Sequence, residues 1–229
     1  MARLDYHGHS TFTLTTDDGT RVVIDPFFND NPWTQIQASD VEADFIFCTH
    51  GHYDHFADAL EIAGSTEATL VGTFELVSYA EIRGIEKVHS MHIGGGWDFP
   101  FGRVKMTAAQ HGGMIAGEGA EGFTTNPVGL LFDLGPGKRL YDAGDTGLTL
   151  DMQLLKGKVD VALLPIGDNF TMGPEDAVTA IEFIEPSVVI PIHYNTWPVI
   201  DQNAEDFRTL VGDRATVEIV EPGRGVYEF

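Results

Sequence analysis

Three histidines and an aspartate crowd into six consecutive positions, in the stretch His50-Gly51-His52-Tyr53-Asp54-His55. The apolar run Asp44–Cys48 comes directly before it and has the length and the β-branched and aromatic content of a buried strand. The run Phe56–Ala63 follows, ends at Gly64, and predicts a short helix. The sequence therefore places the cluster on a strand-to-helix turn, where neighbouring side chains can converge on one point.

The residue types of this cluster indicate a metal site. Neutral imidazole and carboxylate groups are good ligands for a borderline divalent ion such as zinc. A solvated polar loop is the alternative interpretation. Because histidine is an uncommon residue, three of them beside an aspartate favour the metal site. Nitrogen and oxygen ligands without sulfur also admit manganese, iron or nickel.

The same placement, a histidine or aspartate just past a predicted buried strand, recurs later in the chain. The three cases are His111 after Val104–Ala108, Asp145 after Arg139–Tyr141, and His193 after Val188–Ile192. For any one of them alone, a structural role would be the better interpretation. Sheets commonly gather their sites at one end of the strands, so we expect these loops to meet the first cluster there.

The organisation of the chain predicts one large α/β domain over residues 1–229. A hydrophobic fraction of 43% is enough for a substantial core. A hairpin turn at Asp17–Gly19 joins two early strand patterns, and later strand patterns alternate with helical ones such as Pro174–Ile184. This order favours sheets with helices packed outside them.

The charge balance restricts the partners of the protein. There are 35 acidic and 13 basic residues, for a formal net charge of -22. Such a chain repels polyanions, which argues against DNA or RNA as a partner and favours a small-molecule substrate. Because screening by salt relieves self-repulsion, a salt-loving host is one hypothesis, and an ordinary acidic cytosolic protein is the other.

The cellular location is predicted from two kinds of segment that the sequence lacks, a membrane span and a signal peptide. No apolar run approaches the ~20 residues that span a bilayer, and the first residues do not have the pattern of a signal peptide. The lone Cys48 cannot form an internal disulfide, which agrees with a reducing compartment. We therefore expect a cytoplasmic protein that does not bind membranes, and homo-oligomer formation stays open.

The order of the candidate residues resembles the metallo-β-lactamase superfamily along essentially the whole chain. The pattern is His-x-His-x-Asp-His, then a single His, then Gly-Asp-Thr, then a late His. Four shorter motifs are similar to those of the compact metal-dependent hydrolases related to L-ascorbate-6-phosphate lactonase: Tyr6–Ser10, Asp25–Phe27, Pro165–Met172 and His193–Trp197. The resemblance implies a four-layer αββα sandwich of two mixed β-sheets, with helices outside and a two-metal centre at the sheet edge.

The resemblance also implies a ligand set. His50, His52 and His111 would hold one ion, Asp54, His55 and His193 a second, and Asp145 would bridge both. Two divalent ions, for which zinc is the first choice, can share a hydroxide and lower its pKa toward neutrality. The implied function is a dinuclear hydrolase of a small ester or lactone, in which Asp54 is a catalytic ligand. Phosphodiester hydrolysis on the same centre is one alternative, and a non-catalytic metal-binding or sensing protein is another.

His9 is the second candidate catalytic residue. In the resembling hydrolases the equivalent histidine points toward the metals, so His9 is a candidate ligand, substrate-binding donor or proton shuttle. A histidine bonded to a backbone carbonyl is the alternative interpretation. His7 shares the strand face of His9 if that strand is regular, but we expect no role for it. We expect His89 and His92 to be structural.

Three further features concern the surroundings of the predicted centre. The resembling hydrolases often have a histidine where this chain has Asp142, which bears on the substrate more than on the metals. The glycine-rich stretch 112–122 predicts either a mobile flap that presents Met114 and Ile115 or a plain surface loop. Candidate substrate-wall residues next to the ligand loops are Asn169, Thr171, Asn195 and Trp197.

Overall fold

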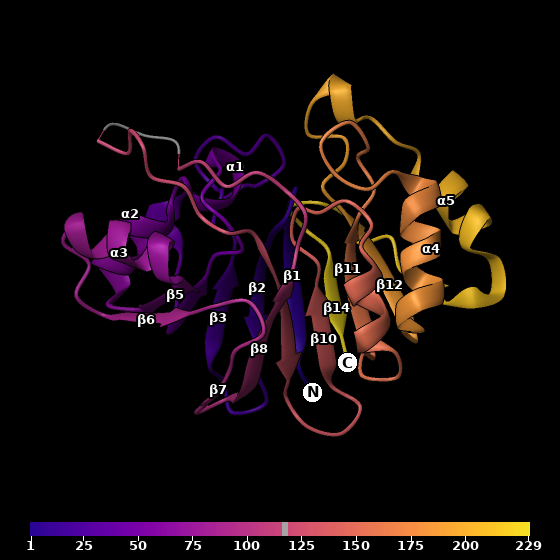
Figure 1. Cartoon of the computed structure of the whole chain (residues 1–229), viewed down its shortest axis with the longest axis horizontal. Helices are drawn as coiled ribbons and strands as arrows, with labels where there is room; N and C mark the ends of the chain where they lie inside the picture. The colour runs from indigo at the N-terminus through magenta and orange to yellow at the C-terminus, as the bar shows by residue number, and fades with distance from the viewer. Residues whose placement is uncertain (116–118) are drawn as a thin grey trace.

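The computed structural model describes residues 1–115 and 119–229, and within them the strands form two seven-stranded sheets (Figure 1). The first sheet has the order β14-β1-β2-β3-β4-β5-β6. Its strands are β1 (Arg3–Gly8), β2 (Thr11–Thr15), β3 (Arg21–Ile24), β4 (Phe45–Phe47), β5 (Thr69–Thr73), β6 (Val88–Met91) and β14 (Val226–Glu228). Strands β1 to β3 are antiparallel, and β3 to β6 are parallel, so the sheet is mixed.

The second sheet has the order β13-β12-β11-β10-β9-β8-β7 and is also mixed. Its strands are β7 (Gly96–Phe99), β8 (Gly102–Ala108), β9 (Val128–Asp133), β10 (Arg139–Asp142), β11 (Val161–Pro165), β12 (Val188–Ile192) and β13 (Thr216–Val217). Strands β7 to β10 are antiparallel, whereas β10 to β13 are parallel.

Helices cover the outer faces of both sheets. On the first sheet lie α1 (Tyr53–Phe56), α2 (Ala59–Thr66) and α3 (Phe74–Ile82), and on the second lie α4 (Pro174–Ile184) and α5 (Ala204–Val211) (Figure 1). Four 3-10 turns within the described residues complete the set: η1 (Ala38–Asp40), η2 (Leu150–Leu155), η3 (Pro198–Ile200) and η4 (Gly212–Arg214). The four-layer αββα sandwich expected from the sequence is confirmed.

Burial on both sides explains the continuous apolar runs of the parallel strands. In β12, Ile190 and Ile192 pack in the core between the two sheets, whereas Val189 packs in the cluster under α4 and α5. The apolar stripe of α4 seals that second cluster, and Pro174 begins the helix with the fixed φ that a first turn accepts. The core therefore consists of three layers, one between the sheets and one under each set of helices.

The helix predicted for Phe56–Ala63 is divided in the structure. Helix α1 ends at Phe56, and α2 begins only at Ala59. Asp58 interrupts them because its carboxylate accepts the backbone N–H groups of Phe28 and Asn29, and its own backbone is not helical. The predicted stop at Gly64 was also wrong, since α2 continues to Thr66.

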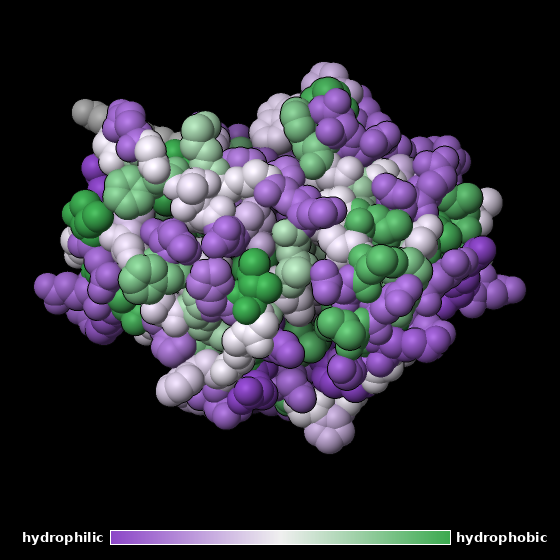
Figure 2. All heavy atoms as spheres, in the orientation of Figure 1, coloured by the Kyte–Doolittle hydropathy of each residue, from purple (hydrophilic) through white to green (hydrophobic). Residues whose placement is uncertain are grey.

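Hydrophilic residues cover most of the face drawn in Figure 2, and hydrophobic ones form small scattered groups between them. Among the described residues, helices are too short or too polar to cross a bilayer. Cys48 is a buried free thiol in the core cluster under α2 and α3.

Candidate metal centre

Six strands end in residues that meet at one edge of the sandwich. His9 follows β1, Asp25 follows β3, and the His50–His55 turn follows β4, while His111, Asp145 and His193 follow β8, β10 and β12. These strands point the same way within their sheets, so their carboxyl ends open onto a common edge.

Three imidazoles form the first group. His50 Nε2 lies 3.0 Å from His52 Nδ1, and His111 Nε2 lies 3.2 Å from the same His52 atom. Three nitrogens each roughly 2.1 Å from one zinc ion would be separated by such distances. Burial lowers the imidazole pKa of all three histidines, which favours the neutral form that binds metals.

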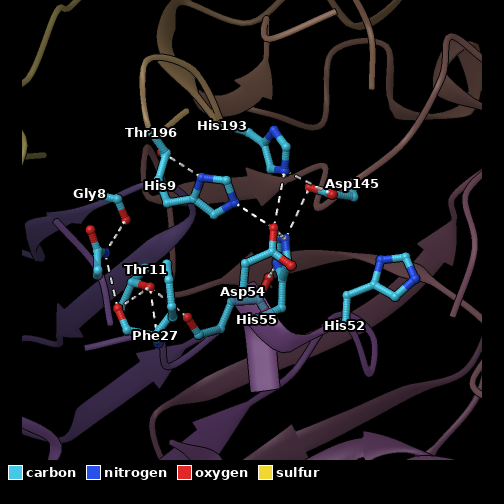
Figure 3. A network of polar contacts seen from close by, with 12 residues as sticks. Gly8, His9, Thr11, Phe27, His52, Asp54, His55, Asp145, His193 and Thr196 are labelled. Atoms are coloured by element: carbon cyan, nitrogen blue, oxygen red, sulfur yellow. Dashed lines mark hydrogen bonds and ion pairs between the residues drawn. The ribbon is translucent and has the colours of Figure 1, made fainter. Parts of the chain in front are cut away.

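Asp54 is the centre of the second group (Figure 3). Its Oδ2 atom lies 2.8 Å from His9 Nε2 and 3.7 Å from the Nε2 atoms of both His55 and His193. Burial acts to raise the pKa of Asp54, but the neighbouring imidazoles outweigh it and hold that pKa far below its usual range. The side chain is therefore an anion with imidazole groups on several sides.

Asp145 lies between the two groups. Its Oδ1 atom is 3.3 Å from His55 Nε2, and its Oδ2 atom is 3.4 Å from His111 Nε2 and 3.0 Å from His193 Nε2. Burial raises the pKa of this carboxyl, but His193 and His55 outweigh burial and hold it well below its ordinary value. One ionised carboxylate thus reaches both groups, and a third set, His50, His55 and Asp145, also has ligand atoms close enough to share an ion.

Unsatisfied buried atoms show that divalent ions suit this donor set. His55 Nε2 and Asp145 Oδ1 are buried without a hydrogen-bond partner in the described part of the chain. Burying a polar atom without a partner costs about 1–3 kcal/mol, and a bound cation would be a partner for both atoms. The donors are imidazole nitrogens and carboxylate oxygens, which zinc, manganese, iron and nickel all accept.

Asp25 orients two of the imidazoles from behind. His55 Nδ1–H donates to Asp25 Oδ2 at 2.7 Å, and the Thr49 hydroxyl donates to the same oxygen at 2.6 Å. Because that hydroxyl has donated its proton, it accepts from Nδ1–H of His50 at 3.0 Å. In the neutral form that a metal ligand requires, both histidines therefore present an Nε2 lone pair to the centre. Sequence reasoning did not assign this role to Asp25, although its position just past a strand was the available signal.

His9 lies next to the centre but off its strand. Gly8, at a φ of 108°, shifts the register of β1 against β2, and His9 follows at a φ of 59°. Its Nδ1 atom is 2.7 Å from Thr196 Oγ1, so the ring bridges Thr196 and Asp54 (Figure 3). The bulge separates it from His7, which instead contacts Thr13 Oγ1 at 2.8 Å.

Left-handed backbone is concentrated around the centre. Among the described residues, eight other than glycine have positive φ, and six of them lie in these loops: His9, Asp25, Asp168, Asn169, His193 and Asn195. The other two, Glu67 and Glu185, end α2 and α4. All six are histidine, aspartate or asparagine, the residues that adopt this conformation most readily after glycine.

A cavity of about 210 Å³ opens over the centre. It is lined by His52, Asp54, His111, Asp145, His193, Phe170 and Trp197. Trp197 was a predicted wall residue, but Asn169, Thr171 and Asn195 do not line the cavity. Asn195 Oδ1 accepts the backbone N–H of Gln202 and closes its own loop, whereas Phe170, which the sequence did not single out, takes part in the wall.

The remaining predicted features lie around this centre. Asp142 is buried, its Oδ1 accepts the backbone N–H of Gly144 at 2.9 Å, and burial together with Asp25 raises its pKa to about 8. Of the proposed flap residues, Met114 is exposed, but Ile115 is buried in the core under α2 and α3. Residues 116–118 lie outside the described residues, so the flap itself is not tested. His89 packs on Trp97 at 5.1 Å between ring centroids, and His92 accepts the backbone N–H of Ile93.

Comparison with known proteins identifies the family. A family model described as the beta-lactamase superfamily domain matches residues 20–194. The chain is also 48% identical over 233 residues to a UPF0173 metal-dependent hydrolase of Heliobacterium modesticaldum, covering 97% of this chain and 96% of that one. The chain belongs to the beta-lactamase superfamily. Within it, the protein is a metal-dependent hydrolase.

Other proteins are similar to this chain over nearly its whole length. A UPF0173 metal-dependent hydrolase of Staphylococcus carnosus is 45% identical over 229 residues, covering 98% of each chain. The solved structure of Igni18, a metallo hydrolase from Ignicoccus hospitalis, has a TM-score of 0.86 and 34% identity and covers 100% of this chain and 99% of that one. An isothiocyanate hydrolase from Delia radicum gut bacteria, at a TM-score of 0.74, 18% identity and 99% coverage of each chain, shares the fold.

Proposed function

We propose that this beta-lactamase superfamily member holds two divalent ions, with zinc as the first choice, and hydrolyses a small ester or lactone. The position of Asp145 carries the proposal, because its two oxygens reach both groups of imidazoles at 3.0–3.4 Å. In this assignment His50, His52 and His111 hold one ion. Asp54, His55 and His193 hold the other, and Asp145 belongs to both.

Bound ions at these positions would acidify a water molecule and polarise the scissile carbonyl. In ester hydrolysis the oxygen of water bonds to the carbonyl carbon, the ester C–O bond breaks, and the leaving alcohol takes up a proton. Asp25 fixes the tautomer of His55, and through Thr49 that of His50. The cavity walls leave room for a small substrate above this donor set.

The geometry favours a positioning role for His9 over a proton shuttle. Its ring is 0% exposed, and it is absent from the lining of the cavity. Both of its nitrogens are engaged, one with Thr196 Oγ1 and one with Asp54 Oδ2. We propose that it holds the Asp54 carboxylate in place and that it adds a further ligand only if Asp54 turns.

Metal analysis tests the two-ion centre directly. Plasma mass spectrometry on protein purified in high salt without chelator should give two ions per chain. Asp145→Ala should bind one ion or none, whereas Asp151→Ala, an exposed aspartate on η2, should keep two. One ion or none in metal-replete wild type would rule out the dinuclear centre and favour a binding or sensing role.

A substrate panel then separates the reactions. We expect turnover of aryl acetates and simple lactones by the metal-loaded protein. Hydrolysis of a bis-aryl phosphodiester without lactone turnover would favour the phosphodiesterase alternative. Because one fold neighbour is an isothiocyanate hydrolase, phenyl isothiocyanate belongs in the same panel, although the likeness at 18% identity supports only the fold.

A further inference from the structure

Among the described residues, the wall of the cavity over the metal centre contains no lysine or arginine. The described lining consists of five residues of the centre together with Phe170 and Trp197. An anionic group on a substrate, away from the reacting bond, would therefore meet no lysine or arginine among the described residues that line the cavity.

The cavity wall does contain carboxylates. Asp54 and Asp145 both line it and bring negative charge to the cavity floor. Two bound ions would neutralise this charge at the reacting bond. The protein as a whole has a formal net charge of -22, which disfavours the approach of an anionic substrate.

Phe170 is presented to the cavity by an unusual turn. Asp168 and Asn169 precede it at φ values of 59° and 48°, and the Asp168 carboxylate accepts the backbone N–H of Asn169 at 2.8 Å. The phenyl ring is 54% exposed although it lines the cavity. An aromatic ring held in water by a left-handed turn is available for contact with a ligand.

Trp197 is the second aromatic wall residue, and its ring is held from behind. It packs on His9 at 4.9 Å and on Phe27 at 6.3 Å between ring centroids. The preceding residue, Thr196, is tied to His9 by its hydroxyl at 2.7 Å. The indole is 37% exposed, so one part is fixed against the protein and the rest faces the cavity.

We propose that the substrate is uncharged apart from the bond that is hydrolysed, and that it carries a flat apolar group that packs against Phe170 and Trp197. This inference rests on the proposed hydrolase function and names its substrate class. It distinguishes this protein from a lactonase of a sugar phosphate, because lysine and arginine are the side chains that commonly bind phosphate and the described lining residues include neither. Phe170 and Trp197 are then the residues that determine specificity.

Ligand binding tests the inference without turnover. Acetanilide and 4-acetamidobenzenesulfonate share the ring and the acyl group and differ by one negative charge. Titrated into metal-loaded protein by calorimetry, acetanilide should bind on the order of tenfold more tightly at low salt. Phe170→Ala should weaken acetanilide roughly fivefold. Phe74→Ala, which removes a similarly exposed phenylalanine on α3, should leave the affinity for acetanilide unchanged.

Tryptophan fluorescence locates the contact. Acetanilide should change the emission of the wild type, and this change should disappear in Trp197→Leu but persist in Trp97→Leu, since Trp97 lies on β7 away from the centre. Equal affinities for the neutral and sulfonated ligands, or an unchanged affinity in both Phe170→Ala and Trp197→Leu, would overturn the inference.

Kinetics separates a failed inference from a failed function. With phenyl acetate and 4-sulfophenyl acetate, Phe170→Arg should raise kcat/KM for the anionic ester and reverse the preference. The wild-type preference should shrink in molar KCl, because screening weakens charge effects but not ring contacts. Equal kcat/KM for the two esters would overturn the inference and leave the hydrolase standing. Turnover of neither ester would contradict the hydrolase proposal, and the binding titration would then decide the ligand class by itself.

Discussion

His55 Nδ1 lies 2.7 Å from Asp25 Oδ2, and both side chains are fully buried behind the metal centre. A buried carboxylate in this position holds the ring in one orientation and one tautomer, and makes its Nε2 atom a stronger ligand. The same oxygen is tied to Thr49, which in turn contacts His50. One carboxylate therefore supports a candidate ligand of each proposed ion.

Replacing this carboxylate should weaken the binding of metal. Asp25→Asn retains the volume of the side chain but loses the charge, and we expect its affinity for zinc to fall roughly 10- to 100-fold. Competition with a chromogenic chelator measures the affinity, and circular dichroism checks that the variant is folded. Asp40→Asn on η1 is the matched control and should bind as wild type does. Wild-type affinity in Asp25→Asn would show that the contact is dispensable.

His9→Phe should act on metal binding through Asp54. Without the bond to His9 Nε2 the carboxylate is free to rotate, so we expect one ion to bind on the order of tenfold more weakly. At saturating metal, the pH profile of kcat/KM should keep its shape, because a positioning residue supplies no proton. Loss of one limb of that profile would instead identify His9 as the proton shuttle.

His7 should make the fold sensitive to mild acid. Burial, opposed by Asp5, lowers its imidazole pKa from 6.5 to about 4, so the unfolded chain takes up a proton at a higher pH than the folded one. Stability is therefore retained above pH 6.5 and lost as the pH falls from 6.5 toward 4. His7→Gln should remove up to about 2 kcal/mol of the loss measured between pH 7 and 5 by urea unfolding. An identical loss in wild type and variant would contradict this assignment.

Local pattern was enough to predict sheets with helices packed outside them and the gathering of His50, His111 and their partners, because each follows the end of a strand. The four-layer arrangement was predicted from the resemblance to the superfamily. Local pattern could not predict the contacts that form between distant segments when the chain folds. Asn195 looked available for a substrate, but its side chain closes a loop onto Gln202. Phe170 lines the cavity after a turn in which Asp168 and Asn169 are left-handed, a conformation that local pattern did not predict. The division between α1 and α2 depends on two N–H groups from a distant loop that bind Asp58.

Salt should stabilise this protein if its charge is an adaptation to a salt-rich host. With 35 acidic and 13 basic residues, repulsion among carboxylates opposes folding at low ionic strength. We expect the melting temperature to rise by at least about 5 °C between 0.1 and 2 M KCl, as screening shortens the range of that repulsion. Sodium chloride should raise the melting temperature by a similar amount. A flat or falling curve would favour the ordinary acidic cytosolic protein.

The six left-handed residues around the centre have a consequence for how ions arrive. These residues lie in loops that follow the ends of strands in two packed sheets, so we expect folding, and not the ion, to set the shape of the loops that hold the imidazoles. A zinc finger, by contrast, is unfolded until its metal binds. Stripping the ions from this chain should leave an intact sandwich that takes them up again without refolding.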